Sequence, residues 1–411
     1  MIQYSEKTLT NGLNIVVNRD LTTELVTVNL LYNVGSKNEN ENHTGFAHLF
    51  EHLMFSGSKN YPDFDNLINS IGGESNAFTN CDITNFYCTV PGLYLETILR
   101  IEADRMCNLI IDESHLTVQK KVVTEEFKQR YLNQPYGDLY KLIRELSYTT
   151  HPYKWQTIGK DISHIESADL DIVRNFYQEF YNPSNAVLAV SGNIKDTEEV
   201  FALAENIFNF ENRGQKTVNY KSEPLQTENR FSEVYRDVPA NVIAITFPMC
   251  KRADSDFYVF DLLSDILSNG KSSRLYDALV RNKRIFTGID AVVSGDDDNG
   301  LFMITGKCSD GIDIKTAEDS IWEELHGLID NPPSEQEFQK VKNKNRATAT
   351  FNNIKIADKA FNLAYYKHLN ILDRINSEYN YYNNVSVAGL QSLADKIFFT
   401  DKHNTLYYRT K

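Results

Sequence analysis

Short apolar runs separated by turn residues open the chain. Leu13 to Val17 and Leu25 to Val34 alternate or cluster apolar side chains. The turn-forming pair Asn11-Gly12 precedes the first run, and Asn18-Arg19-Asp20 helps to separate the two. Runs of this kind, bounded by turn residues, are typical of β-strands. The pattern therefore predicts two opening strands that pair as a hairpin.

Helical periodicity dominates the rest of the first half. Apolar residues recur there at spacings of three and four, as on the buried face of an amphipathic helix. The predicted helices cover residues 63–71, 93–110, 112–131, 137–147 and 169–180. Two further apolar runs, Phe86–Val90 and Ala186–Val190, predict strands, and the second ends at Gly192. This mixture indicates an α+β fold.

The order of elements restarts after a polar stretch at residues 211–230. The apolar run Val242–Phe247 resembles the one at 25–34, and a predicted helix at 256–267 leads into a Ser-Asn-Gly-Lys turn, much as an earlier helix leads into a Ser-Gly-Ser-Lys turn. This internal repeat predicts two copies of one α+β unit. We expect an N-terminal domain at 1–210, a linker at 211–230 and a C-terminal domain at 231–411.

Composition and charge narrow the class of protein. The chain has 411 residues, more than one ordinary core, and its 41% hydrophobic and 24% charged residues are typical of a globular protein. A net charge of −14 without a basic patch disfavours a nucleic-acid partner. No apolar run of about twenty residues could span a membrane, and no charged-then-apolar leader opens the chain. As given, the chain is expected in the cytoplasm, or in the periplasm if a leader has been removed.

The strongest chemical signal is the segment His48-Leu49-Phe50-Glu51-His52. Positions i, i+3 and i+4 share one helical face, so two imidazoles and a carboxylate form a polar stripe between apolar flanks. Buried polar side chains need partners, and a divalent cation would serve both histidines. The spacing is that of the reversed zinc-peptidase pattern, with histidines as ligands and glutamate as base. Chance spacing of three polar residues is the alternative.

A catalytic zinc typically has three protein ligands and one open position. The predicted helix at 112–131 offers Glu125 and Glu126. Glu126 sits at the edge of an apolar stripe that lies within about 45° of one direction, whereas Glu125 points the other way. Glu126 is therefore the expected third ligand, and pairing with an arginine is its alternative role. Glu51 would face the open position and act as the base in peptide-bond hydrolysis.

With Glu126 placed 74 residues after His52, the motif resembles that of the pitrilysin/insulinase-type metallopeptidases. The chain is most similar to their short, two-domain bacterial branch, which is related to the mitochondrial processing peptidase. The resemblance extends to Gly72–Thr79, His151-Pro152-Tyr153, Gly159, Phe176-Tyr177, Tyr181–Asn185 and Ser272–Tyr276. It implies two homologous α+β domains, each a mainly antiparallel sheet packed with helices, that form half of a clamshell. It also implies one Zn2+ per chain and cleavage of short, unfolded peptides.

The resemblance further implies a substrate-binding strand. Asn76, Ala77 and Phe78 would lie on an edge strand beside the zinc, where an extended peptide pairs by β-strand addition. Considered from the residues alone, Gly72-Gly73 marks a turn, and Asn76 is more often a turn or cap residue.

Two positions depart from the family pattern. Gln119 stands where relatives place a glutamate seven residues before the third ligand, and its amide could orient a ligand without supplying charge. Arg281 fits a substrate-gripping arginine, but Gly288 stands where relatives have a tyrosine. A surface arginine at a helix end is the alternative for Arg281.

The missing tyrosine leads us to expect a partner chain. A related chain without zinc would supply it in a heterodimer, as in the two-subunit relatives, and a homodimer is the alternative. A catalytically silent peptide-binding or scaffold subunit of the same fold is the competing function. The four residues His48, Glu51, His52 and Glu126 together favour the enzyme, since a scaffold has no reason to keep all of them.

Overall fold

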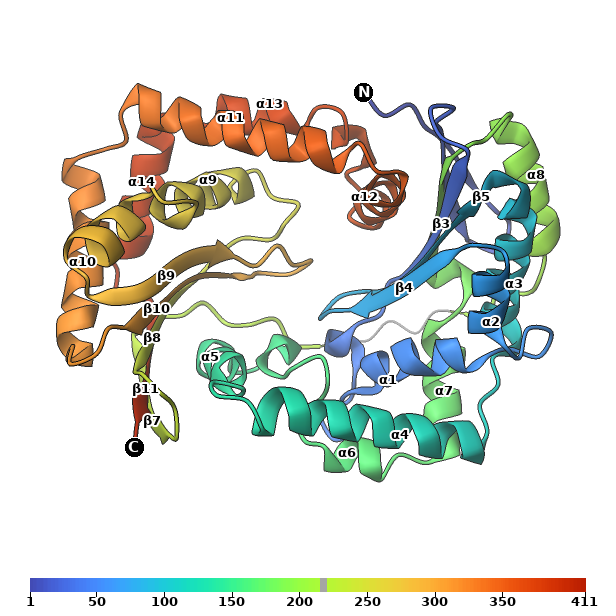
Figure 1. Ribbon diagram of the computed structural model, residues 1–411, viewed down its shortest axis with the longest axis horizontal. Helices are drawn as coiled ribbons and strands as arrows, with labels where there is room; N and C mark the ends of the chain where they lie inside the picture. Colours follow the sequence, from blue (N-terminus) through green and yellow to red (C-terminus); the bar gives the residue numbers. More distant parts are fainter. Residues whose placement is uncertain (215–219) are drawn as a thin grey trace. The chain divides into compact units, whose positions relative to one another are not determined.

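This computed structural model describes residues 1–214 and 220–411. The described chain is built around two β-sheets (Figure 1). The first sheet has six strands in the order β1-β2-β6-β3-β5-β4. Their bounds are β1 Ser5–Thr8, β2 Asn14–Arg19, β3 Leu25–Tyr32, β4 Glu74–Thr79, β5 Thr84–Pro91 and β6 Ala186–Gly192. Only β2 and β6 are parallel neighbours, and β4 forms one edge of the sheet.

The predicted hairpin of the two opening runs is wrong, because β6 lies between β2 and β3. Strand β2 instead forms a hairpin with β1 around Asn11-Gly12, where Gly12 has a φ of 90°. Strand β6 comes from far along the chain. No local pattern in the first residues could reveal this long-range insertion.

The second sheet follows the same path. Its five strands lie in the order β7-β11-β8-β10-β9. Their bounds are β7 Arg230–Arg236, β8 Val242–Pro248, β9 Phe286–Val293, β10 Leu301–Cys308 and β11 Asn404–Thr410. β7 and β11 are parallel, and the other neighbours are antiparallel. Without β1, the first sheet has the same order and directions, so the predicted repeat of one α+β unit is confirmed.

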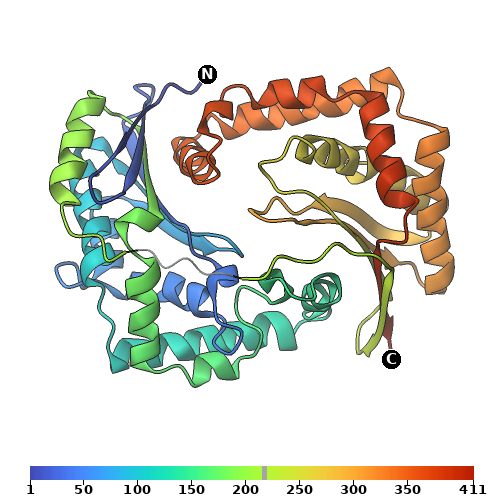
Figure 2. The same ribbon diagram turned by 180° about the vertical axis from the view of Figure 1, so that it is seen from behind.

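Helices cover both faces of the first sheet (Figures 1 and 2). The helices of this unit are α1 Phe46–Leu53, α2 Phe64–Ser70, α3 Leu95–Asn108, α4 Glu113–Phe127, α6 Ser163–Glu166, α7 Leu170–Phe180, α8 Thr197–Ile207 and α12 Ile356–His368. A π-helical turn at Lys128–Leu132 extends α4. Helix α12 packs against β3 and β6 on one face, whereas α3 and α8 pack on the other.

The second sheet is covered in the same manner. Its helices are α5 Leu139–Ser147, α9 Phe257–Ser268, α10 Ile314–Asp330, α11 Glu335–Asn352, α13 Glu378–Asn384 and α14 Val387–Phe398, with a π-helical turn at Tyr276–Asn282. Buried residues of β8 such as Ile245 and Phe247 share one core with Leu263 of α9 and Leu325 of α10. None of the helices in the described part of the chain is long and apolar enough to cross a membrane.

The two compact units are not contiguous in sequence. The first comprises 1–129, 155–220 and 349–376, and the second comprises 130–154, 221–348 and 377–411. The expected domains, 1–210 and 231–411, differ from these units by an exchange of two segments. Helix α5 packs on β7, β8 and β11, and helix α12 packs on β3 and β6. Within the expected linker 211–230, residues 215–219 lie outside the described residues.

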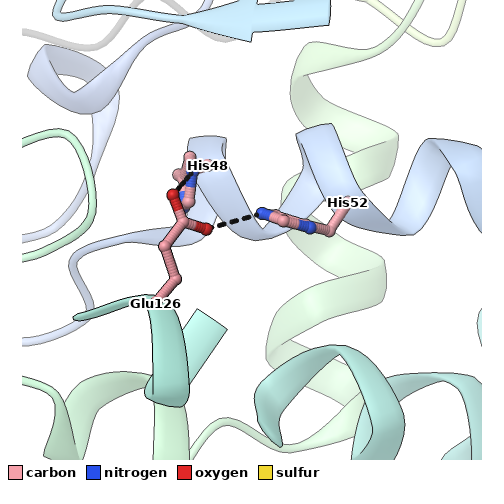
Figure 3. A group of neighbouring side chains, drawn as sticks. All are labelled: His48, His52 and Glu126. Carbon is pink, nitrogen blue, oxygen red and sulfur yellow. Dashed lines mark hydrogen bonds and ion pairs between the residues drawn. The ribbon is translucent and has the colours of Figure 1, made fainter. Parts of the chain in front are cut away.

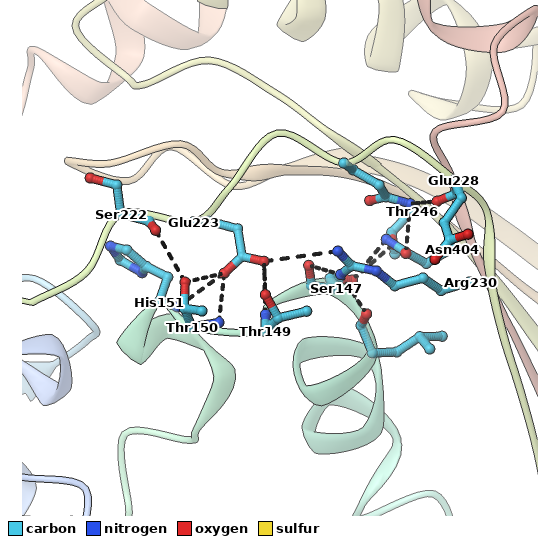
Figure 4. Close-up of polar contacts among 12 residues, drawn as sticks. Ser147, Thr149, Thr150, His151, Ser222, Glu223, Glu228, Arg230, Thr246 and Asn404 are labelled. Carbon is cyan, nitrogen blue, oxygen red and sulfur yellow. Dashed lines mark hydrogen bonds and ion pairs between the residues drawn. The ribbon is translucent and has the colours of Figure 1, made fainter.

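A cluster of hydrogen bonds fixes α5 and its following turn to the second unit (Figure 4). The Glu223 carboxylate accepts backbone N–H bonds from Thr149 (2.8 Å), Thr150 (2.9 Å) and His151 (3.0 Å). The Arg230 guanidinium donates to the carbonyl oxygens of Leu146 and Ser147. Polar contacts from Glu223 and Arg230, in the last part of the expected linker, therefore help to hold α5 and the turn after it in this unit.

Candidate metal centre

Helix α1 carries both motif histidines, of which His48 is buried and His52 is partly exposed. Gly45 precedes the helix with a φ of 90°, and a Cβ there would lie 2.6 Å from the Ile158 carbonyl oxygen. On the apolar side, the Phe50 ring stacks on Tyr177 with an 11° angle between the planes. Tight packing around the helix therefore holds its polar stripe in one orientation.

A buried carboxylate caps the start of α1. Glu39 is only 5% exposed, and its two oxygens accept 2.9 Å hydrogen bonds from the backbone N–H groups of Gly45 and Ala47. Burial raises the pKa of Glu39 to about 8, although the Ala47, Gly45 and Phe46 N–H groups oppose this effect. The sequence does not reveal this role of Glu39, because no local capping pattern links it to a helix that begins seven residues later.

Glu126 lies in the last turn of α4, which packs against α1. Its side chain is 17% exposed and points toward the histidines. The neighbouring Glu125 is 71% exposed and pairs with Lys128 at 2.8 Å. The two adjacent glutamates therefore occupy the inner and outer faces that the apolar stripe of this helix predicts.

The three expected ligands converge on one point (Figure 3). A Glu126 oxygen lies 3.2 Å from His52 Nε2, and the other lies 3.7 Å from His48 Nε2. One ligand atom from each residue lies within 4.8 Å of the other two. Ligands at zinc bond lengths in a tetrahedron are about 3.4 Å apart. The donor set of two imidazoles and one carboxylate, at these separations, fits a zinc ion.

Glu51 lies on the same helix, between the two histidines in sequence. Its side chain is half-buried. Because residues at i, i+3 and i+4 share a face, the helix presents this carboxylate beside the ligand cluster. The site therefore holds one carboxyl group in addition to the three expected ligands.

Strand β4 contains the expected substrate contacts. Asn76, Ala77 and Phe78 lie on this edge strand, whose neighbour in the sheet is β5. Helix α1 packs against β4, so the strand lies beside the helix that carries the histidines. The Asn76 side-chain oxygen accepts the Ala77 backbone N–H at 2.8 Å.

Two other expected residues each have a partner close by in their own unit. Gln119 donates to Ser56 Oγ at 3.1 Å, so its amide supports the turn after α1 instead of orienting a ligand. Arg281 lies in the π-helical turn of the second unit, where it is 63% exposed and pairs with Asp277.

Fold and site together define a repeated α+β protein in which one repeat carries a cluster of metal-ligand type. Residues 14–153 match the family described as Insulinase (Peptidase family M16), and residues 167–345 match the family described as Peptidase M16 inactive domain. The chain belongs to the M16 family of peptidases.

Relatives of this chain include proteins named as zinc proteases. It is 28% identical to the zinc protease PqqE of Helicobacter pylori, over 99% of this chain and 93% of the relative. It is 26% identical to the uncharacterized zinc protease YmxG of Bacillus subtilis, over 73% and 72% of the two chains.

Solved structures share the fold. A crystal structure of a protease from Helicobacter pylori superposes with a TM-score of 0.94 at 28% identity, with both chains fully covered. The periplasmic protease PqqL from Escherichia coli superposes with a TM-score of 0.80 at 18% identity. The superposition covers 98% of this chain and 47% of the longer PqqL chain.

Proposed function

We propose that this protein is a zinc-dependent endopeptidase that cleaves short, unfolded peptides. The observation that carries the proposal is the convergence of His48, His52 and Glu126, whose ligand atoms lie within 4.8 Å of one another. Zinc is the proposed metal because the donor set suits it and because relatives are named zinc proteases. One Zn2+ per chain is proposed, since α9, the counterpart of α1 in the second unit, carries no histidine.

When bound, zinc would act as a Lewis acid that polarises the scissile carbonyl and lowers the pKa of water. In this mechanism Glu51 takes a proton from the attacking water as general base. The resulting carboxylic acid then donates that proton to the departing amine. The short helix α1 keeps Glu51 and both histidines on one face, so the base needs no large movement to reach the water.

The proposed substrate is an extended peptide that pairs with the free edge of β4. Edge strands offer unpaired backbone groups, which give affinity without regard to sequence. Folded proteins keep their backbone groups paired, so this mode of binding favours unfolded segments.

We further propose that a related chain without zinc completes the active enzyme. The position in β9 where relatives have the tyrosine is Gly288, which has no side chain that could grip a substrate. The PqqL chain from Escherichia coli, of which this fold covers 47%, is long enough for a second copy of the fold. A homodimer is the alternative. Full activity of the purified single chain would count against the partner, and co-purification of a related chain would support it.

A catalytically silent subunit remains the competing function. One matched family is described as inactive, but the match covers residues 167–345 and excludes His48, Glu51, His52 and Glu126. A silent subunit would bind peptides without cleaving them, whereas the enzyme would do both.

Replacement of the proposed base separates the two functions. Glu51→Gln should lower kcat for an unstructured peptide at least about a hundredfold, because the amide cannot accept a proton from water. Zinc content should stay at the wild-type level, since none of the proposed ligands is changed. Cleavage at the wild-type rate by Glu51→Gln would contradict the assignment of the base.

A further inference from the structure

A cavity of about 790 Å³ adjoins the edge strand β4 in the first unit. Residues of α2, β4, β5 and the N-terminal end of α12 line it. Its volume lies in the range of about 300–1,000 Å³ that is typical of ligand pockets. The metal cluster and Glu51 are not part of its lining.

The strand register places Glu74, Asn76 and Phe78, which line this cavity, on the opposite face of the sheet from Phe86. Asn76 lies opposite Tyr87, and Phe78 lies opposite Asn85, and all four line the cavity. The next residue along β5, Phe86, points to the other face and packs against the turn that follows α1. Successive side chains of a strand alternate between faces. A peptide added to β4 would therefore direct every second side chain to the cavity and the others to the side of α1.

The cavity combines carboxylates with aromatic walls. Asp65 of α2, Glu74 of β4 and Asp358 of α12 converge on it, against one amine, that of Lys355. No hydrogen bond or ion pair joins these carboxylates to other residues in the described part of the chain. Phe78 and Phe361 form an edge-on aromatic contact in its wall, with ring centroids 5.4 Å apart.

We propose that this cavity is a side-chain subsite for lysine or arginine residues of the bound peptide, an inference that rests on the proposed peptidase function. Aromatic and methylene surfaces would pack on the aliphatic stem of such a side chain, and the carboxylates would neutralise its charged end. Along one face of β4, Glu74, Asn76 and Phe78 span about 13 Å. The subsite therefore accepts two basic side chains placed two residues apart.

A peptide series tests the subsite directly. One position at a time in an unstructured peptide carries lysine, norleucine or glutamate, and kcat/KM is measured for each. Lysine should be preferred over norleucine by about fivefold at alternate positions, and glutamate should be disfavoured there. Asp358→Lys and, separately, Asp65→Lys should reverse this order. The control Glu198→Gln, on an exposed part of α8 away from the cavity, should keep the lysine preference. Thermal unfolding checks that each variant is folded.

The same series distinguishes failure of the subsite from failure of the enzyme. Binding of each peptide to Glu51→Gln protein is measured by fluorescence anisotropy, which needs no cleavage. A lysine preference in binding alone supports the subsite while overturning the peptidase. A lysine preference that does not alternate along the peptide would overturn the subsite, and so would one that survives both charge reversals. The lack of any lysine preference in both assays would overturn it as well.

Discussion

Two of the three proposed ligands share helix α1, so the start of this helix determines where both imidazoles lie. Glu39 fixes that start through two hydrogen bonds of 2.9 Å to backbone N–H groups. Gly45 immediately precedes the helix and Ala47 lies in its first turn, so neither N–H group has a partner within the helix. Glu39 is therefore a positioning residue, which touches neither metal ligand side chain nor substrate but orients the helix that carries the ligands.

Glu39→Ala should weaken the protein and its zinc site together. Removal of the carboxylate leaves two buried N–H groups unpaired, at a cost of about 1–3 kcal/mol each. The midpoint temperature of thermal unfolding of the metal-free protein should decrease. The affinity for zinc, measured by competition with a chelator, should decrease as well. Glu41→Gln is the control, because Glu41 is 51% exposed and its ion pair with Lys160 lies at the surface. Equal effects of the two substitutions would argue against a capping role.

Local periodicity in the sequence is enough to predict the positions of some site residues but not of others. The spacing of His48, Glu51 and His52 and the inward side of Glu126 follow from helical geometry, which the sequence displays directly. The contacts of Glu39 and Gln119 arise from tertiary packing between elements. Periodicity says nothing about which surfaces meet, so these contacts were not predictable from a single sequence.

Among the elements, helices were easier to predict than the order of strands. The five helices expected in the first half are present as α2, α3, α4, α5 and α7. Amphipathic spacing marks a helix by itself, whereas a strand's neighbours depend on segments far away in sequence. The insertion of β6 between β2 and β3 and the attachment of α5 to the second sheet are both long-range events.

The attachment of α5 depends on the carboxylate of Glu223. Burial disfavours its ionisation, but the N–H groups of His151, Thr150 and Thr149 outweigh this and hold the pKa below 4.5. A lowered carboxylate pKa contributes stability above its unfolded value, and this stability is lost as the pH falls through the folded value.

Glu223→Gln should therefore destabilise the protein by about 1–3 kcal/mol at pH 7. The difference from wild type should shrink as the pH falls from 4.5, where the carboxylate of the unfolded chain becomes protonated, through the lower pKa of the folded state, below which it is protonated in both states. Urea unfolding at a series of pH values measures it, and Glu228→Gln, on the exposed end of the same segment, is the control. A difference that does not change with pH would contradict an electrostatic origin.

At the scale of the whole molecule, each half of the sequence supplies a helix that covers the sheet of the other half. Helix α12, from the second half, covers a face of the first sheet with buried Ala360, Leu363 and Ala364. Helix α5, from the first half, covers a face of the second sheet. Cutting the chain at the linker therefore removes one covering helix from each sheet.

The fragment 1–210 should consequently fail to fold cooperatively on its own. Loss of α12 would uncover residues of β3 and β6 that are now buried, and the exposed apolar surface would favour aggregation. Co-expression with the fragment 211–411 should restore a folded complex. A soluble 1–210 fragment that unfolds cooperatively at the temperature of the intact protein would disprove this dependence.

The most direct test of the proposed zinc site compares the adjacent glutamates of α4 by metal analysis after purification with zinc in excess. The wild type and Glu125→Gln should each retain one zinc per chain, because Glu125 points away with 71% of its side chain exposed. Glu126→Gln should lose the metal, because it replaces the carboxylate that lies 3.2 Å from His52. A wild-type chain without zinc, or a Glu126→Gln chain that keeps its full share, would contradict the proposed metal site.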